Sequence, residues 1–282
     1  MKIFIWGMGL IGTSLALALR EKGHQISGSV RSAKSRETLA RMGFERVTTD
    51  EAQALQMLQD CDMLALGLNV NDCFRILDIA LSDSARATPL IVFDMCSTKT
   101  DICAHAGSLP LATHFVGTHP MAGKEKQGPE AADATLFAGQ TVFVTATEAA
   151  ANAASTVTNI WQSVGAQIVP IDARVHDRTM AYVSHGLHLA ACMIADLSGE
   201  VFDPAMPVSP VAGSYRDMTR IAMSSGEMWQ SITDTNRENI ADWLTELGKR
   251  SATLAQHVRS GQADIKRLFA DAERARRKFM RT

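Results

Sequence analysis

Short apolar runs alternate with longer amphipathic ones through the first half of the chain. Residues 2–6 and 25–30 are apolar runs of strand length. Residues 10–22 and 34–42 repeat their apolar positions with helical spacing. The alternation continues with strands predicted at 62–66, 90–93, 115–116, 141–145 and 167–170 and helices predicted at 72–81 and 148–164. This order predicts a mostly parallel sheet with helices on both faces.

The pattern changes at residue 173, after which no strand-like run follows. Helices are predicted to open near residue 173 and to cover 225–260 and 262–281. The first of these is apolar over much of its surface, more than a domain of roughly 110 residues needs for its own core. We therefore expect a sheet domain at 1–171 and an all-helical domain at 172–282, through which the chain forms a homodimer.

Composition and charge narrow the class of protein. The chain has 282 residues, of which 46% are hydrophobic and 21% charged, enough for two globular domains. Its apolar runs are far shorter than the about 20 residues that cross a bilayer, so no membrane association is expected. A net charge of −2 gives no reason to expect nucleic acid as a partner. The five cysteines and the absence of a signal-peptide pattern favour a cytoplasmic location.

The sequence GMGLIG follows the first predicted strand directly and opens the first predicted helix. Gly7 permits a tight turn, Gly9 lets backbone amides approach a pyrophosphate, and Gly12 allows the helix to pack closely on the strand. In this context the pattern predicts a Rossmann-type dinucleotide site, and a purely structural turn is the alternative. The predicted contacts in the turn are Gly7, Met8, Gly9, Leu10, Ile11 and Gly12.

The end of the second predicted strand carries no carboxylate to bind the ribose 2′-hydroxyl of NAD. It reads Ser29-Val-Arg31-Ser32 instead, with a guanidinium and hydroxyls that suit a 2′-phosphate. We therefore predict NADP as the favoured cofactor, bound by Ser29, Arg31 and Ser32, with NAD as the alternative. In a second interpretation these side chains are merely solvated polar groups where a surface helix begins.

Four further segments carry candidate chemistry: Asp94–Lys99, Gly117–Glu125, Ser184–His188 and Gly213–Ala222. Together with GMGLIG they resemble, in the same order and over nearly the whole chain, the prephenate/arogenate (cyclohexadienyl) dehydrogenase family. The segments HPMAG and YRDMTRIA are the most distinctive. The resemblance implies oxidative decarboxylation of prephenate or arogenate in tyrosine biosynthesis, with a hydride passing to NAD(P) (CH–CH donor group).

The resemblance also implies roles for individual residues. His119 takes up the hydrogen of the ring hydroxyl, for which a neutral imidazole is suited. Ser97 hydrogen-bonds near the same hydroxyl and the nicotinamide, although a serine before a helix also suits an N-cap. Arg220 binds the ring carboxylate through its planar guanidinium, and Asp217, one helical turn earlier, pairs with it.

Three more residues are implied at the periphery of the substrate. Glu125 matches an acidic residue at the site entrance, although an exposed loop glutamate is the alternative. His185 and His188 lie three apart on one helical face, and His188 matches a histidine that recognises the substrate side chain. Relatives often carry proline before the second histidine, whereas Leu187 stands here, which predicts a more regular helix. No third ligand at zinc spacing accompanies the two histidines, so no metal is expected.

Two alternative functions remain open from the sequence. One is a related enzyme acting on the 4-amino-4-deoxy analogue of prephenate in a specialised pathway. The other is a non-catalytic NADP-binding regulator, which the presence of His119, Ser97, Arg220 and Asp217 disfavours. The sequence does not decide between prephenate and arogenate, nor does it indicate regulation by tyrosine.

Overall fold

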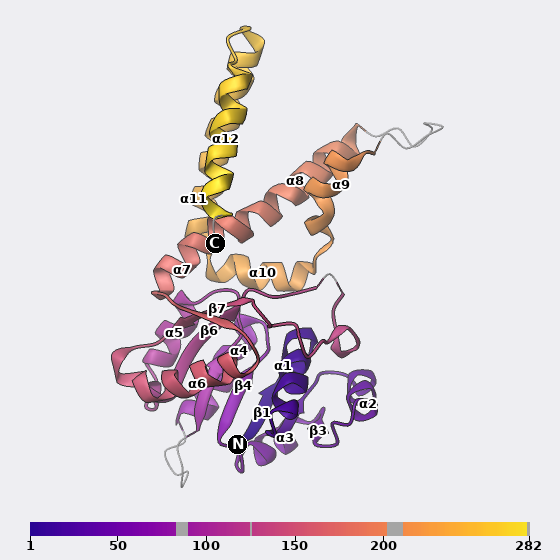
Figure 1. Cartoon of the computed structure of the whole chain (residues 1–282), viewed down its shortest axis with the longest axis vertical. Helices are drawn as coiled ribbons and strands as arrows, with labels where there is room; N and C mark the ends of the chain where they lie inside the picture. Colours follow the sequence, from indigo (N-terminus) through magenta and orange to yellow (C-terminus); the bar gives the residue numbers. More distant parts are fainter. Residues whose placement is uncertain (83–89, 125, 202–210, 281–282) are drawn as a thin grey trace.

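The structure is a computed structural model that describes residues 1–82, 90–124, 126–201 and 211–280. A sheet domain comes first, and a helical domain lies against one edge of its sheet (Figure 1). The amino end of the first strand, Lys2–Trp6, lies on the side of the sheet away from the helical domain, near the N terminus of the chain. The carboxyl ends of the parallel strands therefore face the helices.

The sheet has eight strands in the order β3-β2-β1-β4-β5-β6-β7-β8. Its strands are β1 (Lys2–Trp6), β2 (Gln25–Ser29), β3 (Val47–Thr48), β4 (Met63–Leu66), β5 (Ile91–Asp94), β6 (Phe115–Pro120), β7 (Thr141–Thr145) and β8 (Gln167–Pro170). Neighbouring strands are parallel except β6 and β7, which pair antiparallel. The prediction of a mostly parallel Rossmann-type sheet is confirmed.

Helices cover both faces because the strands alternate apolar side chains between two cores. Ile3 and Ile5 of β1 point to one core, and Phe4 and Trp6 point to the other. The first core includes side chains of α1 (Leu10–Glu21), α2 (Ala33–Arg41) and α6 (Ala151–Ser163). The second includes side chains of α3 (Glu51–Leu58), α4 (Val70–Ser82) and α5 (Thr100–Gly107). Three short 3-10 turns lie between elements: η1 (Ala112–His114), η2 (Pro129–Ala131) and η3 (Glu148–Ala150).

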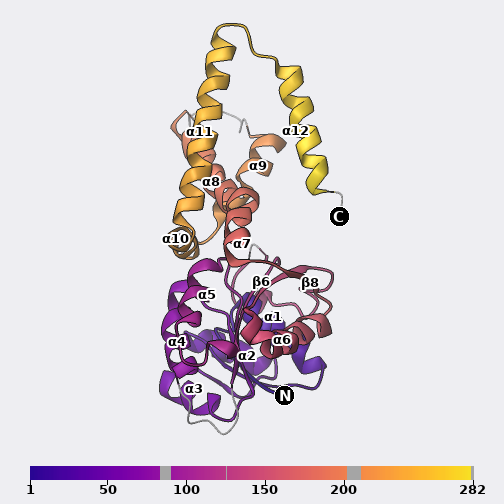
Figure 2. The ribbon, with the colours of Figure 1, turned by 90° about the vertical axis from the view of Figure 1, so that its left-hand side faces the viewer.

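The helical domain begins directly after β8. It consists of α7 (Ala173–Met180), the π-helical turn η4 (Ala181–His185), α8 (Gly186–Glu200), α9 (Gly213–Thr219), the 3-10 turn η5 (Arg220–Met223), α10 (Gly226–Thr235), α11 (Arg237–Arg259) and α12 (Ile265–Phe279). In Figure 2, α7 and α10 lie next to the sheet domain, while α11 and α12 extend away from it. Among the described residues, no helix is long and apolar enough to cross a bilayer.

Two local features depart from the regular helices that the sequence predicts. The helix expected over 225–260 is broken at Asn236, whose backbone lies at φ −131° and ψ 31°. The helix that carries the two histidines is interrupted by η4, although Leu187 in place of proline predicts a more regular helix. π-Helical turns are rare and often occur at functional sites. Both departures lie where the helical domain meets the sheet.

A buried ion pair ties β5 to β6 at the carboxyl edge of the sheet. Lys99 and Asp94 have fully buried side chains, and the Lys99 ammonium donates to the Asp94 carboxylate. It also donates to the Thr118 carbonyl at 2.8 Å, while Asp94 accepts the Thr118 amide at 3.0 Å. Burial opposes the charge on Lys99, but the Asp94 carboxylate, together with the nearby Cys96 and Cys103, outweighs burial and raises the pKa of Lys99. Lys99 is therefore held as a cation inside the protein.

Lys99→Met should destabilise the sheet domain by about 3–5 kcal/mol, because it leaves the Asp94 carboxylate buried without its cation. The measurement is the urea midpoint followed by tryptophan fluorescence. Lys34→Met, at an exposed position of α2, is the matched control and should change the free energy of unfolding by less than about 0.5 kcal/mol. Equal midpoints for the two variants would show that the buried pair contributes nothing.

Candidate active site

The glycine turn between β1 and α1 has the geometry that its sequence predicts. Gly7 has φ +96°, a left-handed conformation that favours glycine. A β carbon on Gly12 would lie 2.4 Å from the Gly7 carbonyl oxygen, so the helix packs against the turn only because this side chain is absent. The Ser29 carbonyl at the end of β2 accepts the amides of Gly7 and Met8 at 3.2 and 2.9 Å. Backbone contacts therefore fix the turn.

The turn leaves room and amide donors for a dinucleotide. A β carbon on Gly9 would meet no heavy atom within 4 Å, and no side chain caps the N terminus of α1. Uncapped amides and the helix dipole together suit a pyrophosphate. The side chain of Met8 is fully buried, so this residue can offer only backbone atoms, while Leu10 and Ile11 are half-buried. The residues present thus fit a nicotinamide dinucleotide.

The predicted 2′-phosphate contacts lie at the end of β2 and the start of α2. Arg31 is exposed and forms an ion pair of 3.3 Å with Glu227 of α10. Ser32 caps α2, because its hydroxyl accepts the Ser35 amide at 3.1 Å. Ser29 is buried. Ser32 therefore has a structural role, and any role of these three residues in cofactor binding stays a prediction.

His119 lies near the end of β6, at the carboxyl edge of the sheet. Its imidazole is 9% exposed, and its Nδ1 atom lies 2.9 Å from Nε2 of His176 in α7. Nδ1 of His176 in turn lies 2.8 Å from Oδ1 of Asp177. Both α7 side chains are buried. Asp172 caps this helix by accepting the amides of Arg174 and Val175, which positions His176 one turn into α7.

The surroundings of His119 keep its imidazole neutral. Burial lowers the pKa of His119 well below the ordinary value of 6.5, and His176, Lys99 and His185 lower it further. The buried Lys99 ammonium is the fixed cation among these groups. A neutral imidazole in water-poor surroundings has a lone pair that can accept a proton from a bound hydroxyl.

Ser97 follows β5 on the same edge but does not cap the next helix. The N-cap of α5 is Lys99, which makes no side-chain capping bond. The Asp177 carboxylate fills that place, since it accepts the amides of Lys99 and Thr100 at 2.7 and 2.8 Å. The Ser97 side chain is half-buried, and its hydroxyl has no hydrogen bond among the residues that the structure describes. It is therefore available to a ligand.

The two histidines of the helical domain differ in environment. His185 is buried, its Nδ1 atom lies 3.0 Å from the Asn236 amide nitrogen, and burial lowers its pKa to about 4. His188 is half-buried, lies near Trp229 with ring centroids 4.2 Å apart, and is 3.0 Å through Nδ1 from the Ser184 carbonyl oxygen. The indole nitrogen of Trp229 is buried without a partner among the described residues. His188 is thus the more accessible of the two.

The remaining predicted substrate residues lie along the helical domain. Arg220 opens η5, which packs against α8, and Asp217 lies in the preceding helix α9. Both are exposed, and no ion pair joins them in the described part of the chain. Glu125 lies outside the described residues. Their roles toward substrate stay predictions.

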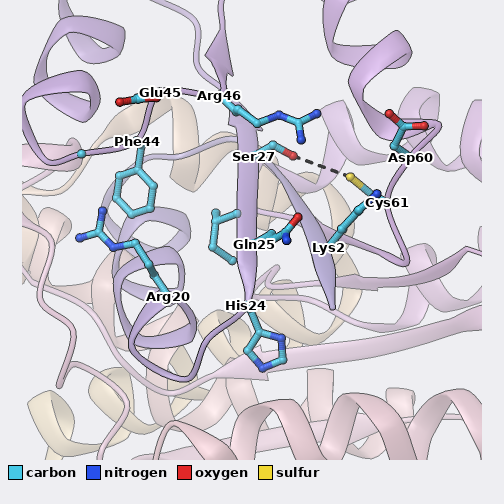
Figure 3. Close-up of a pocket in the computed structure, with 12 residues that line it drawn as sticks. Lys2, Arg20, His24, Gln25, Ser27, Phe44, Glu45, Arg46, Asp60 and Cys61 are labelled. Atoms are coloured by element: carbon cyan, nitrogen blue, oxygen red, sulfur yellow. Dashed lines mark hydrogen bonds between the residues drawn. The ribbon is translucent and has the colours of Figure 1, made fainter.

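A surface pocket lies at the other edge of the sheet and is separate from this site. Figure 3 shows Lys2, His24 and Gln25 around it, at the amino ends of β1 and β2. The pocket has a volume of about 330 Å³, and no predicted site residue lines it.

Across residues 1–82, 90–124, 126–201 and 211–280, no group of three or more histidine, cysteine or acidic side chains is arranged to hold a metal ion.

The sequence does not reveal His176 and Asp177, which join the two domains at the site, or Asn236, which contacts Asp177 within the helical domain. His176, Asp177 and Asn236 are buried there, and none lies in a segment that the sequence singles out. Asn236 donates to the Asp177 carbonyl oxygen at 2.8 Å. The one available signal was a histidine-aspartate pair at the start of the first helix after the sheet.

A glycine turn and a buried neutral histidine at the carboxyl ends of the parallel strands are typical of a dinucleotide-dependent dehydrogenase.

Comparison with known proteins places the chain more closely. The family model for the nucleotide-binding domain of prephenate dehydrogenase matches residues 15–170, and the model for its dimerization domain matches residues 172–271. A prephenate dehydrogenase of Lactococcus lactis is 30% identical over 285 residues, covering 98% of this chain and 76% of the relative. A cyclohexadienyl dehydrogenase of Zymomonas mobilis is 30% identical over 236 residues, covering 82% and 79%. The chain belongs to the prephenate dehydrogenase family.

Solved structures agree with this assignment. The crystal structure of prephenate dehydrogenase from A. aeolicus, in complex with hydroxyphenyl propionate and NAD+, superposes with a TM-score of 0.88 at 26% identity. The match covers 99% of this chain and 98% of that one. The family resemblance stated from the motifs is therefore confirmed.

Gly9→Ala should weaken dinucleotide binding on the order of tenfold without lowering the melting temperature, because the methyl group enters only the space in front of the helix amides. Gly12→Ala is the matched comparison and should lower the melting temperature, because its β carbon collides with the Gly7 carbonyl. Cofactor titration by fluorescence and thermal unfolding distinguish the two. Unchanged affinity in Gly9→Ala would remove this turn from the cofactor site.

Proposed function

We propose that the protein oxidatively decarboxylates prephenate or arogenate, with transfer of a hydride to NAD(P), in the biosynthesis of tyrosine. The observation that carries this is the buried, neutral His119 at the same sheet edge as the glycine turn, in a chain of the prephenate dehydrogenase family. No observation favours the 4-amino analogue or a non-catalytic regulator. Prephenate and arogenate differ only in the side chain at C1.

The chemistry requires a hydride acceptor, a proton acceptor and a group that holds the ring carboxylate. The nicotinamide, when bound, accepts the hydride from ring carbon C4. His119 takes the proton of the C4 hydroxyl through Nε2, the nitrogen that does not contact His176. As the C1 carboxylate leaves as carbon dioxide, its bonding electrons enter the ring, which becomes aromatic, and the C4 oxygen takes the proton back from His119. Arg220 holds that carboxylate until it leaves, and Asp217 orients Arg220.

The other predicted residues complete the substrate site in this proposal. Ser97 hydrogen-bonds to the C4 hydroxyl and holds it toward His119. His188 contacts the side chain at C1, with His185 behind it and Glu125 at the entrance. The open hydroxyl of Ser97 and the partial exposure of His188 support these assignments.

We also propose a role for each domain and a homodimeric assembly. The sheet domain at 1–171 binds the cofactor, and the helical domain at 172–282 forms a homodimer. Apolar side chains are exposed along the helical domain, including Leu197, Met193 and Phe269 at 61–72%. A monomer would leave this surface in water. A cytoplasmic location stays a prediction from the cysteine content.

Turnover of prephenate, arogenate and the 4-amino analogue, each with NAD and NADP, tests the function. His119→Asn should keep cofactor affinity but lower kcat by about 10²–10⁴-fold, because the proton acceptor is lost. In the unaltered chain the acid limb of kcat/KM should lie below pH 6.5, because only neutral His119 is active and its pKa is lowered. Activity is present above that pKa and lost as pH falls through it. Near-normal kcat in His119→Asn would contradict the role of this residue.

We propose NADP as the favoured cofactor. Arg31 and the first turn of α2 directly follow β2, where no carboxylate is present to bind a 2′-hydroxyl. Glu227, however, already pairs with Arg31, so a 2′-phosphate would compete with this carboxylate for the guanidinium. Both side chains of this pair are exposed, so replacing the Glu227 carboxylate by a phosphate costs little free energy.

Arg31→Gln should lower kcat/KM for NADP about tenfold or more while changing the value for NAD less than about twofold, because only the 2′-phosphate loses a charged partner. Glu227→Gln is the opposing variant and should raise kcat/KM for NADP. Steady-state kinetics with both cofactors provide the measurement. A tenfold preference of the unaltered chain for NAD would overturn the assignment.

A further inference from the structure

Three buried side chains form a continuous hydrogen-bonded row that ends at the proposed proton acceptor. The row runs from Asp177 through His176 to His119, with contacts of 2.8 and 2.9 Å. Asp177 and His176 are 1% and 0% exposed. Each end of the His176 imidazole therefore faces one protein partner, and water does not compete for either nitrogen.

The Asp177 carboxylate can only accept hydrogen bonds and cannot donate one. Burial alone would raise its pKa, but hydrogen bonds from His176, Thr100 and Lys99 outweigh burial and lower it. Two of these donors are backbone amides at the N terminus of α5, where the helix dipole also stabilises negative charge. An ionised carboxylate has no proton to donate, so Nδ1 of His176 must donate to it.

The protonation of the remaining nitrogens follows from this donor. With its proton on Nδ1, the imidazole of His176 presents a lone pair on Nε2, which accepts a hydrogen bond only from Nδ1 of His119. His119 then carries its own proton on Nδ1 and a lone pair on Nε2. An imidazole without such a partner distributes its proton between both nitrogens, and the fraction protonated on Nε2 cannot accept a proton there.

We propose that His176 and Asp177 are positioning residues that hold His119 in the one tautomer able to accept the substrate proton. This inference rests on the proposed function for the identity of that proton. The arrangement resembles in logic the carboxylate that fixes the histidine tautomer in serine proteases, but a second imidazole is inserted between the two groups. That insertion lets a carboxylate in the helical domain act on a base in the sheet domain.

A purely structural role for His176 is the competing explanation. Its ring also contacts Phe143, with centroids 5.4 Å apart, so any substitution removes some packing. Two substitutions of similar shape distinguish the explanations. In His176→Gln, the glutamine Oε1 atom reaches the place of the imidazole Nε2 and can still accept from His119. In His176→Asn, the shorter side chain reaches only the place of Nδ1 and leaves His119 without an acceptor.

The kinetic test compares His176→Asn with His176→Gln. His176→Asn should lower kcat by about a hundredfold, with KM for substrate and cofactor within about twofold, because binding groups are untouched. His176→Gln should recover at least about tenfold of that loss, since the acceptor is restored. His257→Asn, at an exposed position of α11, is the control and should match the unaltered chain. Equal kcat losses in both His176 variants, or none in His176→Asn, would overturn the proposal.

Nitrogen NMR of the histidine-labelled protein reads the tautomer without any turnover. The His119 signals are assigned by their loss in His119→Asn. In the unaltered chain Nδ1 of His119 should be protonated and Nε2 unprotonated, and in His176→Asn the proton should lie predominantly on Nε2. Protonation of Nε2 in the unaltered chain would refute the proposal. Absence of turnover with every cyclohexadienyl substrate would overturn the proposed function, while these shifts still decide the tautomer.

Discussion

The Asp177 carboxylate at the N terminus of α5 is the interaction on which the site depends. It accepts two amides of the sheet domain, although it belongs to the first helix of the helical domain. No side chain of α5 caps these amides, and burying them without an acceptor would cost about 1–3 kcal/mol each. Docking of the domains and capping of α5 are therefore one interaction. Because His176 precedes Asp177, the same contact brings an imidazole against His119.

The charges around His119 are arranged so that the base itself remains uncharged. Lys99 is cationic and paired with Asp94, and Asp177 is anionic and held by amides and His176. Burial is the main cause that lowers the pKa of His119, and the buried Lys99 cation adds to it by disfavouring a second positive charge. The two buried carboxylates thus have different effects: Asp94 retains the cation, and Asp177 orients the base. The fixed charges keep His119 neutral between turnovers.

The sequence predicted the sheet well because its strands are buried on both faces and read as apolar runs, as in Met63–Leu66. It missed β3, which has only two residues, and α3, which has only eight. The glycine turn was predictable because its spacing follows from backbone geometry alone. The Asp177 contact was not, because it joins residues 78 positions apart and has no local pattern. Asn236 was predicted to lie inside one long helix, since nothing local shows that its side-chain amide contacts Asp177 and His185.

The two ends of the domain junction differ in strength, and this difference follows from burial. In the buried part of the junction lie the Asp177 carboxylate and the hydroxyl pair Thr98–Thr235, whose oxygens are 2.8 Å apart, so breaking these contacts leaves polar groups unpaired. At the cofactor end, Arg31 and Glu227 meet with side chains 79% and 67% exposed, and such pairs contribute about 0–1 kcal/mol. Water replaces that contact at little cost. The junction is thus held by buried contacts at the N terminus of α5 and by an exposed ion pair beside the end of β2.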